Sequence, residues 1–472
     1  MLKVSLYCIL LNVIVTIVAT KEENLLTNVI IGLLLIASFI FMVWYCMKGY
    51  NLMVGFFIMA SIWVILVLIG NAIEPTAVLK GKSVIDVLTF VYADGPAAYA
   101  QSILVNIFFG AFFGRVLIDT GIAATLIRKV VELGGDMPRL TMSLLCIVTA
   151  VIFMSMTGIG PVISIAVIVL PILFSLGISA PVALFAFMGS IMAGIFCNTV
   201  NFIQYHTMYA GFVKSAASYS YNDYFRIGLI GMIVGLVVVL TIANLTMHSG
   251  TSHNWAVNAQ QASGKENAPW YSWIAVVLPV LGVVLLKLPI IFGFIASAVY
   301  AMLTTGKLRG SYKEVTRRFA KLFTDGSIDV APMIGFLLSL AMFNNAATYA
   351  APYFTALIGN IIPTNHLVLA LVFALLVPLG FFRGPMNWVG SGAAIFAVVL
   401  AANPGIPVQF MYPLTAATTI FPQHLDVTQS WVAWGFGYTK VASKDYLKRS
   451  LPAGWICGAI MCVIIYFMYG NL

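Results

Sequence analysis

The chain has 472 residues, of which 61% are hydrophobic and 8% are charged, and its mean hydropathy is +1.02. A soluble domain contains roughly 25% charged residues, so this composition excludes a water-soluble protein and indicates an integral membrane protein. The net charge of +9 does not indicate nucleic-acid binding, because basic residues on the short loops of a membrane protein commonly set its orientation.

The apolar residues form solid blocks, and this pattern predicts transmembrane helices rather than a β-barrel, whose strands would alternate apolar and polar residues. About 11–13 of these blocks are expected to cross the membrane, since a spanning helix needs about 20 residues. The six cysteines stand inside apolar blocks without a CxxC or Cys/His cluster. Neither a disulfide framework nor a zinc site is therefore expected.

The first predicted element is an extra N-terminal span within residues 1–28. Its apolar stretch of about 17 residues is longer than the apolar part of a typical signal peptide. We therefore interpret it as a retained span rather than as a cleaved signal. Residues 29–247 then form the first half of the chain, residues 248–272 form a polar linker, and residues 273–472 form the second half.

The strongest cluster of basic residues follows the first two apolar blocks of the second half. Six Lys and Arg side chains stand in Gly306–Ser327, which predicts a cytoplasmic segment. The two apolar blocks before it are joined only by Lys287–Pro289. If both blocks cross the membrane, the polar linker and the basic segment lie on the same, cytoplasmic side.

Helix-breaking residues interrupt the apolar blocks at corresponding places in the two halves. "MSMTGIG" (Met154–Gly160) aligns with "FFRGPMNW" (Phe381–Trp388), and the same shift pairs Gly177 with Gly405. Interrupted helices in corresponding places of inverted repeats surround the central site of many transporters. We therefore predict an all-α polytopic membrane protein built from two inverted repeats, with re-entrant hairpins and discontinuous helices.

Arg383 is the only charged residue between Asp329 and Asp426. A charge at the centre of a spanning helix costs about 2.5–3.5 kcal/mol on insertion scales, so some interaction must offset it. A structural interpretation is that Arg383 reaches the membrane interface or pairs with Asp426. We favour a functional one, in which its planar guanidinium binds a carboxylate in a central cavity through two parallel hydrogen bonds.

Other polar residues in the apolar sequence are candidates for binding the coupling ion. Asp119 follows Arg115 by four positions, so it either forms an ion pair within one helix or acts as an ion site. Asn344 and Asn345 offer carbonyl oxygens that either cap a helix break or bind a cation. His424 and Asp426 are the best candidates for carrying a proton. No cofactor is expected, and no metal beyond Na⁺.

Three stretches resemble the gluconate permease family and, more broadly, the ion transporter superfamily that includes citrate, C4-dicarboxylate and lactate carriers. They are "FGAFFGRVLIDTGIAATLIRKVVELGG", "TGIGPVISIAVIVLPILFSLGI" and "YCMKGYNLMVGFFIM". The resemblance implies a carrier of organic anions that is often a homodimer. It also implies substrate-binding residues in both halves: Thr157, Gly158, Asn198 and Asn201, then Arg383, Gly384, Asn387, Ser391, Asp426 and Thr428.

The sequence as a whole thus predicts a secondary active symporter in a bacterial cytoplasmic (inner) membrane. Its expected substrate is a small organic anion, such as a hydroxy- or dicarboxylic acid or a sugar acid, and its driving ion is H⁺ or Na⁺. An inorganic-ion (Na⁺/H⁺) antiporter is one alternative, in which Asp119 and Asp426 would be central. A membrane-embedded enzyme is another, although the chain has no GxxxxGK[ST], HExxH or GxSxG motif.

Overall fold

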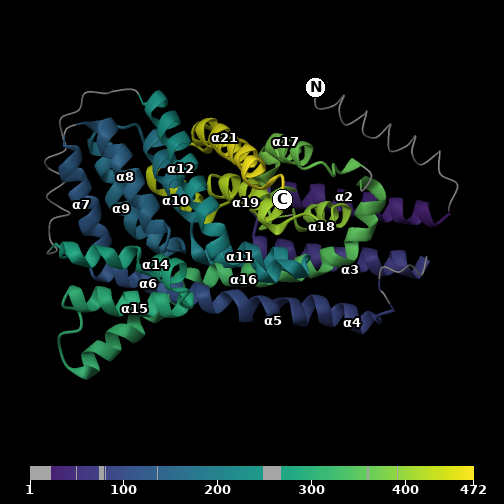
Figure 1. Ribbon diagram of the computed structural model, residues 1–472, viewed down its shortest axis with the longest axis horizontal. Coiled ribbons are helices and arrows are strands. Elements are labelled where there is room, and N and C mark those ends of the chain that lie inside the picture. Colours follow the sequence, from purple (N-terminus) through teal and green to yellow (C-terminus); the bar gives the residue numbers. More distant parts are fainter. Residues whose placement is uncertain are drawn as a thin grey trace.

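The described part of the chain folds entirely into helices and loops, without any β-strand (Figure 1). The computed structural model describes residues 23–48, 50–73, 79, 81–135, 137–247, 267–358, 361–390 and 392–472. Most of the predicted N-terminal span and most of the predicted linker therefore lie outside the described residues.

Several helices of the first half begin at Pro or directly after Gly or Asn. Pro138 begins α8, a position that tolerates proline because its missing N–H would have no partner in the first turn. Gly158 precedes α9 with a φ of +98°, which glycine adopts without steric cost. The helices are α2 (Glu23–Met47), α3 (Leu52–Ile73), α4 (Val84–Thr89), α5 (Gly95–Tyr99), α6 (Val105–Asp119), α7 (Ile122–Gly134), α8 (Pro138–Phe153), α9 (Ile159–Ser175), α10 (Ala180–Phe196), α11 (Thr199–Ala210) and α12 (Tyr221–Thr246).

The second half contains one very long helix, α16, of 47 residues. It includes most of the predicted basic segment, so that part of the segment is helical. The helices are α14 (Leu278–Leu286), α15 (Ile290–Thr304), α16 (Tyr312–Ile358), α17 (His366–Leu376), α18 (Gly392–Ala402), α19 (Val408–His424), α20 (Ser430–Thr439) and α21 (Ser443–Tyr469). Short 3-10 helices cover Lys214–Ser218, Trp270–Val276 and Val377–Arg383, and π-helical turns cover Phe90–Asp94 and Ala100–Leu104.

The order of helices and breaks recurs in the second half with a similar spacing. The chain distance from the first residue of α8, Pro138, to that of α17, His366, equals the distance from Ala180 in α10 to Val408 in α19. Helices α10 and α19 are also equally long, at 17 residues each. These helices of the second half therefore begin about as far along as their counterparts in the first half. That the two halves are inverted in the membrane stays a prediction.

The predicted multi-pass, all-helical membrane fold is confirmed. In the described residues, 5 helices are long and apolar enough to cross a membrane, or up to 7 if each of two bent pairs forms one span. The bent pairs are α6–α7, with a bend of 56°, and α10–α11, with a bend of 62°. The re-entrant segments predicted from the sequence are Thr157–Gly177 and Gly384–Gly405. The first contains one helix, α9, and the second contains one helix, α18.

Helix α10 forms the centre of the packing. Every residue from Val182 to Phe196 is buried, and the helix contacts α8, α12, α19 and α21. Small residues allow this close packing: a side chain on Gly189 would collide with Val239 of α12. On the other flank, α16 packs against α3, α6 and α18 and runs along the molecule (Figure 1).

Candidate functional site

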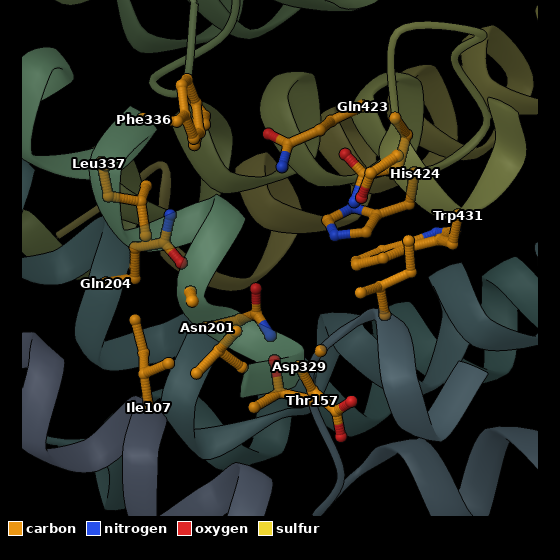
Figure 2. Close-up of a pocket in the computed structure, with 18 of the residues that line it drawn as sticks. Ile107, Thr157, Asn201, Gln204, Asp329, Phe336, Leu337, Gln423, His424 and Trp431 are labelled. Carbon is orange, nitrogen blue, oxygen red and sulfur yellow. The ribbon is translucent and has the colours of Figure 1, made fainter. Parts of the chain in front are cut away.

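A cavity of about 420 Å³, lined by both apolar and polar side chains, lies where breaks of both halves meet beside α16 (Figure 2). Residues at or just before the starts of α9, α11 and α20 line it. Of the predicted substrate-binding residues, it is lined by Thr157, Gly158, Asn201, Arg383 and Thr428, together with the predicted proton carrier His424. The cavity therefore brings together residues that are more than two hundred positions apart in the chain.

Arg383 is 96% buried, with only 4% of its surface exposed, and its guanidinium lines the cavity. Its Nη2 donates a hydrogen bond of 2.6 Å to Oε1 of Gln429, and its Cζ lies 5.8 Å from the centre of the Phe336 ring. The backbone that presents it is strained, because Phe382 and Arg383 have φ angles of +55° and +58°. Each costs roughly 1–2 kcal/mol in this left-handed region.

The loop after Arg383 is held closed by Asn387. Its Nδ2 donates to the Gly380 carbonyl at 2.9 Å, and its Oδ1 accepts from the Val389 N–H at 2.8 Å. Gly384 and Gly390 lie where the backbone folds closely on itself, so a side chain at either position would collide with backbone atoms. Gly384 and Asn387 therefore shape the loop rather than line the cavity, and Ser391 lies outside the described residues.

Asn198 joins two breaks of the first half. Its Oδ1 caps α11 by accepting from the N–H groups of Val200 and Asn201 at 2.9 and 3.1 Å. Its Nδ2 donates to the carbonyls of Phe153 and Met156, at 2.9 and 3.0 Å, in the break before α9. With both ends of its amide engaged by the backbone, Asn198 supports the cavity wall from behind.

Asp426 occupies the corresponding position in the second half and has a similar role. Its carboxylate accepts from the N–H of Thr428 at 3.0 Å, from the hydroxyl of Thr428 at 2.9 Å, and from the N–H of Phe382. No ion pair joins it to Arg383 within the described residues. The pairing of Arg383 with Asp426 considered from the sequence is thus replaced by the hydrogen bond to Gln429.

His424 forms part of an aromatic wall of the cavity. Its ring stacks on Trp431, with the ring centres 5.5 Å apart, as Figure 2 shows. Its Nδ1 lies 2.9 Å from the Ile420 carbonyl, one turn back in α19. These contacts fix the orientation of the imidazole.

The cavity contains three glutamines that sequence reasoning missed: Gln204, Gln423 and Gln429. Figure 2 shows Gln204 and Asn201 extending towards the cavity from one side, with Gln423 and His424 on the other. One signal was present in the sequence, because polar residues recur at every third position from Asn198, which caps α11, through Asn201 to Gln204. That spacing places them along one side of a helix.

The carboxylate of Asp329 also lines the cavity, but it is already paired. Arg115 of α6 binds it through two hydrogen bonds of 2.6 Å each, from Nε and Nη2. The expected pair between Arg115 and Asp119 therefore does not form, because the long arginine side chain reaches across to α16. Asp119 lies away from this cavity.

The electrostatics of the cavity favour an anion. Helices α9, α11 and α20 begin at it, and the N-terminal end of a helix has a partial positive charge. Arg383 adds a positive charge, which the nearby Asp426 carboxylate partly offsets, and the charge of Asp329 is balanced by Arg115. The amide and hydroxyl groups of Thr157, Asn201 and Gln204 supply neutral hydrogen-bonding partners.

The chain is thus a polytopic, all-helical membrane protein with a cavity among its broken helices that contains a buried arginine. No protein-family model and no curated protein matches it. Among solved structures, it is similar to the YdaH transporter of Alcanivorax borkumensis, whose crystal structure was described as having an unusual topology. The TM-score is 0.59 at 12% sequence identity, over 89% of this chain and 99% of the YdaH chain. The likeness shows that this chain has the fold of a membrane transporter, and the gluconate permease family stays an expectation.

Proposed function

We propose that the protein is a secondary active transporter that carries a small organic anion together with H⁺ or Na⁺ across a bacterial cytoplasmic membrane. The observation that supports this most is a buried arginine, Arg383, in a cavity bounded by helix N-termini. Hydroxy acids, dicarboxylic acids and sugar acids combine a carboxylate with further polar groups. They match a cavity that offers one guanidinium and several amides.

Substrate recognition in this proposal divides between the two halves. Arg383 holds the carboxylate, aided by the N-terminal end of α20, while Asn201 and Gln204 of α11 bind hydroxyl groups or a second carboxylate. The volume of about 420 Å³ falls within the range of small-molecule sites, about 300–1,000 Å³. Because the walls come from both halves, a relative movement of the halves would change access to the substrate.

The central test replaces Arg383 and measures binding and uptake of small carboxylates by purified protein in proteoliposomes. Arg383→Lys keeps the charge but removes the planar fork, so substrate binding should weaken by about 1.5–3 kcal/mol. Arg383→Ala should weaken it further. Arg449→Lys is the matched control, because Arg449 is a half-buried arginine that contacts Thr246 and the Asp445 carbonyl of its own helix.

Three outcomes would contradict the proposal. Wild-type affinity in Arg383→Ala would show that the arginine is structural. Ion exchange without uptake of any carboxylate, unchanged by Arg383→Lys, would indicate an inorganic-ion antiporter instead. Chemical alteration of the added carboxylate by the reconstituted protein would indicate a membrane-embedded enzyme.

A further inference from the structure

A second cavity of about 240 Å³ lies between α11, α16 and the π-helical turn Phe90–Asp94. Its lining residues include Asp94, Thr207, Asn344, Asn345 and Thr348. Asp94 is the only charged residue between Asp86 and Arg115, in an otherwise apolar stretch. Asp94 is exposed, and its carboxylate has no hydrogen bond or ion pair with another described residue.

Two hydroxyl groups that line the same cavity already donate their protons to backbone carbonyls. The Thr207 hydroxyl donates its proton to the backbone carbonyl of Ile203 at 2.8 Å, and the Thr348 hydroxyl donates its proton to the backbone carbonyl of Asn344 at 3.3 Å. A hydroxyl whose proton is used in this way has only lone pairs left to offer.

The two asparagines add carbonyl oxygens to this set. Nδ2 of Asn345 donates to the Phe90 carbonyl at 2.6 Å, which leaves Oδ1 as an acceptor. Asn344 has only 8% of its surface exposed, and its Oδ1 is buried without a hydrogen-bond partner. Gly95 permits the approach, because a side chain there would come within 2.8 Å of the Asn345 amide. The cavity thus contains an unsatisfied buried acceptor beside a carboxylate.

We propose that this cavity is a sodium site, in which the Asp94 carboxylate, the side-chain oxygens of Asn344 and Asn345, and the hydroxyls of Thr207 and Thr348 bind one Na⁺. Hard cations take oxygen ligands of these kinds. One carboxylate balances one monovalent charge. No group of three or more His, Cys, Asp or Glu that could hold a metal ion exists in the described residues, which argues against a transition metal.

The sodium site and the anion cavity share two helices. On α11, Gln204 lines the anion cavity and Thr207, one turn later, lines the sodium cavity. On α16, Phe336 lines the first and Asn344 lines the second, two turns apart. Binding of Na⁺ that fixes α11 against α16 would therefore also fix the wall that holds the anion. As a coupling site, this inference rests on the proposed transport function; as a cation site, it does not.

The test measures thermal unfolding of the purified full-length protein in NaCl, KCl and choline chloride at equal ionic strength. NaCl should raise the melting temperature in a saturable way, whereas KCl and choline chloride should not. Asp94→Asn should abolish the sodium-dependent shift while keeping the melting temperature in choline chloride. Asn344→Ala and Thr207→Val should each raise the half-maximal NaCl concentration by about tenfold or more.

Asp119→Asn is the matched control, because it removes a carboxylate outside both cavities, and its sodium-dependent shift should equal that of the wild type. A wild-type protein that responds equally to NaCl and KCl, or to neither, overturns the sodium site. The site is also overturned if Asp119→Asn loses the sodium-dependent shift while Asp94→Asn keeps it. If Asp94→Asn does not fold, Thr207→Val decides, because its unchanged sodium response would equally overturn the site.

Carboxylate uptake separates this inference from the proposed function. A sodium shift that depends on Asp94, in a protein that takes up no carboxylate, keeps the cation site and refutes the transport proposal. Carboxylate uptake that needs Arg383 but proceeds equally without Na⁺ refutes the coupling role and keeps the transport proposal.

Discussion

At the scale of single residues, the position of Arg383 depends on backbone geometry as much as on its own contacts. Two successive non-glycine residues, Phe382 and Arg383, have left-handed backbone angles, and the hydrogen bond from Phe382 N–H to Asp426 helps to hold them. Gly390 packs directly against the Arg383 backbone, leaving no room for a side chain. Strain of this kind persists only where the surroundings enforce it, and it is frequent at functional sites.

Gly390→Ala should therefore impair the anion site without removing any of its functional groups. The new methyl group would collide with the Arg383 carbonyl and lie 2.8 Å from its Cα, so the arginine must shift. Overpacking of this kind costs about 1–3 kcal/mol, and we expect weaker carboxylate binding together with a lower melting temperature. Both are measured on the purified variant, by ligand titration and by thermal unfolding.

Gly405→Ala is the control for this prediction. A side chain on Gly405, in the loop between α18 and α19, would meet nothing within 4 Å. It should leave both the affinity and the melting temperature close to those of the wild type. Unchanged carboxylate affinity in Gly390→Ala would mean that the guanidinium position does not depend on this loop.

At the scale of elements, each half uses one buried polar side chain to connect two helix breaks. Asn198 links the start of α11 to the break before α9, and Asp426 links the residues before α20 to Phe382. Backbone groups freed by a break inside a membrane are costly unless protein or water satisfies them. These two side chains satisfy several of them, and they leave the next polar residues, Asn201 and Gln429, to face the cavity.

Replacing Asn198 and Asn201 separately should distinguish support from recognition. Asn198→Ala removes a cap and leaves two buried carbonyls without donors, so the free energy of unfolding should fall by about 2–5 kcal/mol. Asn201→Ala should change stability by less than about 1 kcal/mol but weaken carboxylate binding by about 1 kcal/mol. Thermal unfolding and ligand titration on the folded fraction measure the two effects. The reverse pattern, with Asn198→Ala stable but defective in binding, would make Asn198 the recognition residue.

The sequence was informative wherever the signal is local. Composition predicted the membrane class, and glycine and proline predicted the breaks, because these residues act on their own backbone. The isolation of Arg383 indicated its importance for the same reason, and the structure places it at the cavity. The ion pair between Arg115 and Asp119, one of two interpretations of Asp119, does not form, because Arg115 binds Asp329, 214 positions away on another helix. No local pattern contains that contact.

At the scale of the whole molecule, α14 and α15 form a short hairpin before the basic start of α16. The helices have 9 and 15 residues and are joined by a left-handed residue, Lys287. The Tyr300 hydroxyl donates to the Tyr271 carbonyl at 2.8 Å, so the two ends of the hairpin meet. The residues that follow the linker and those that begin α16 should therefore share one side of the membrane, whether or not each helix crosses it fully.

This arrangement gives a direct test of orientation. Tyr312 at the start of α16 and Trp270 before α14 are 85% and 73% exposed, respectively. Position 312 is chosen for the cysteine because the neighbouring Ser311 is needed by the helix: its hydroxyl caps α16 by accepting a hydrogen bond of 3.3 Å from the N–H of Glu314. Because basic segments stay in the cytoplasm, we expect single cysteines at positions 312 and 270, in a cysteine-free background, to resist an impermeant thiol reagent in intact cells. Both should react after the cells are permeabilised, which confirms that each thiol is accessible. Labelling of both from outside would reverse the predicted orientation, and labelling of only one would contradict the hairpin itself.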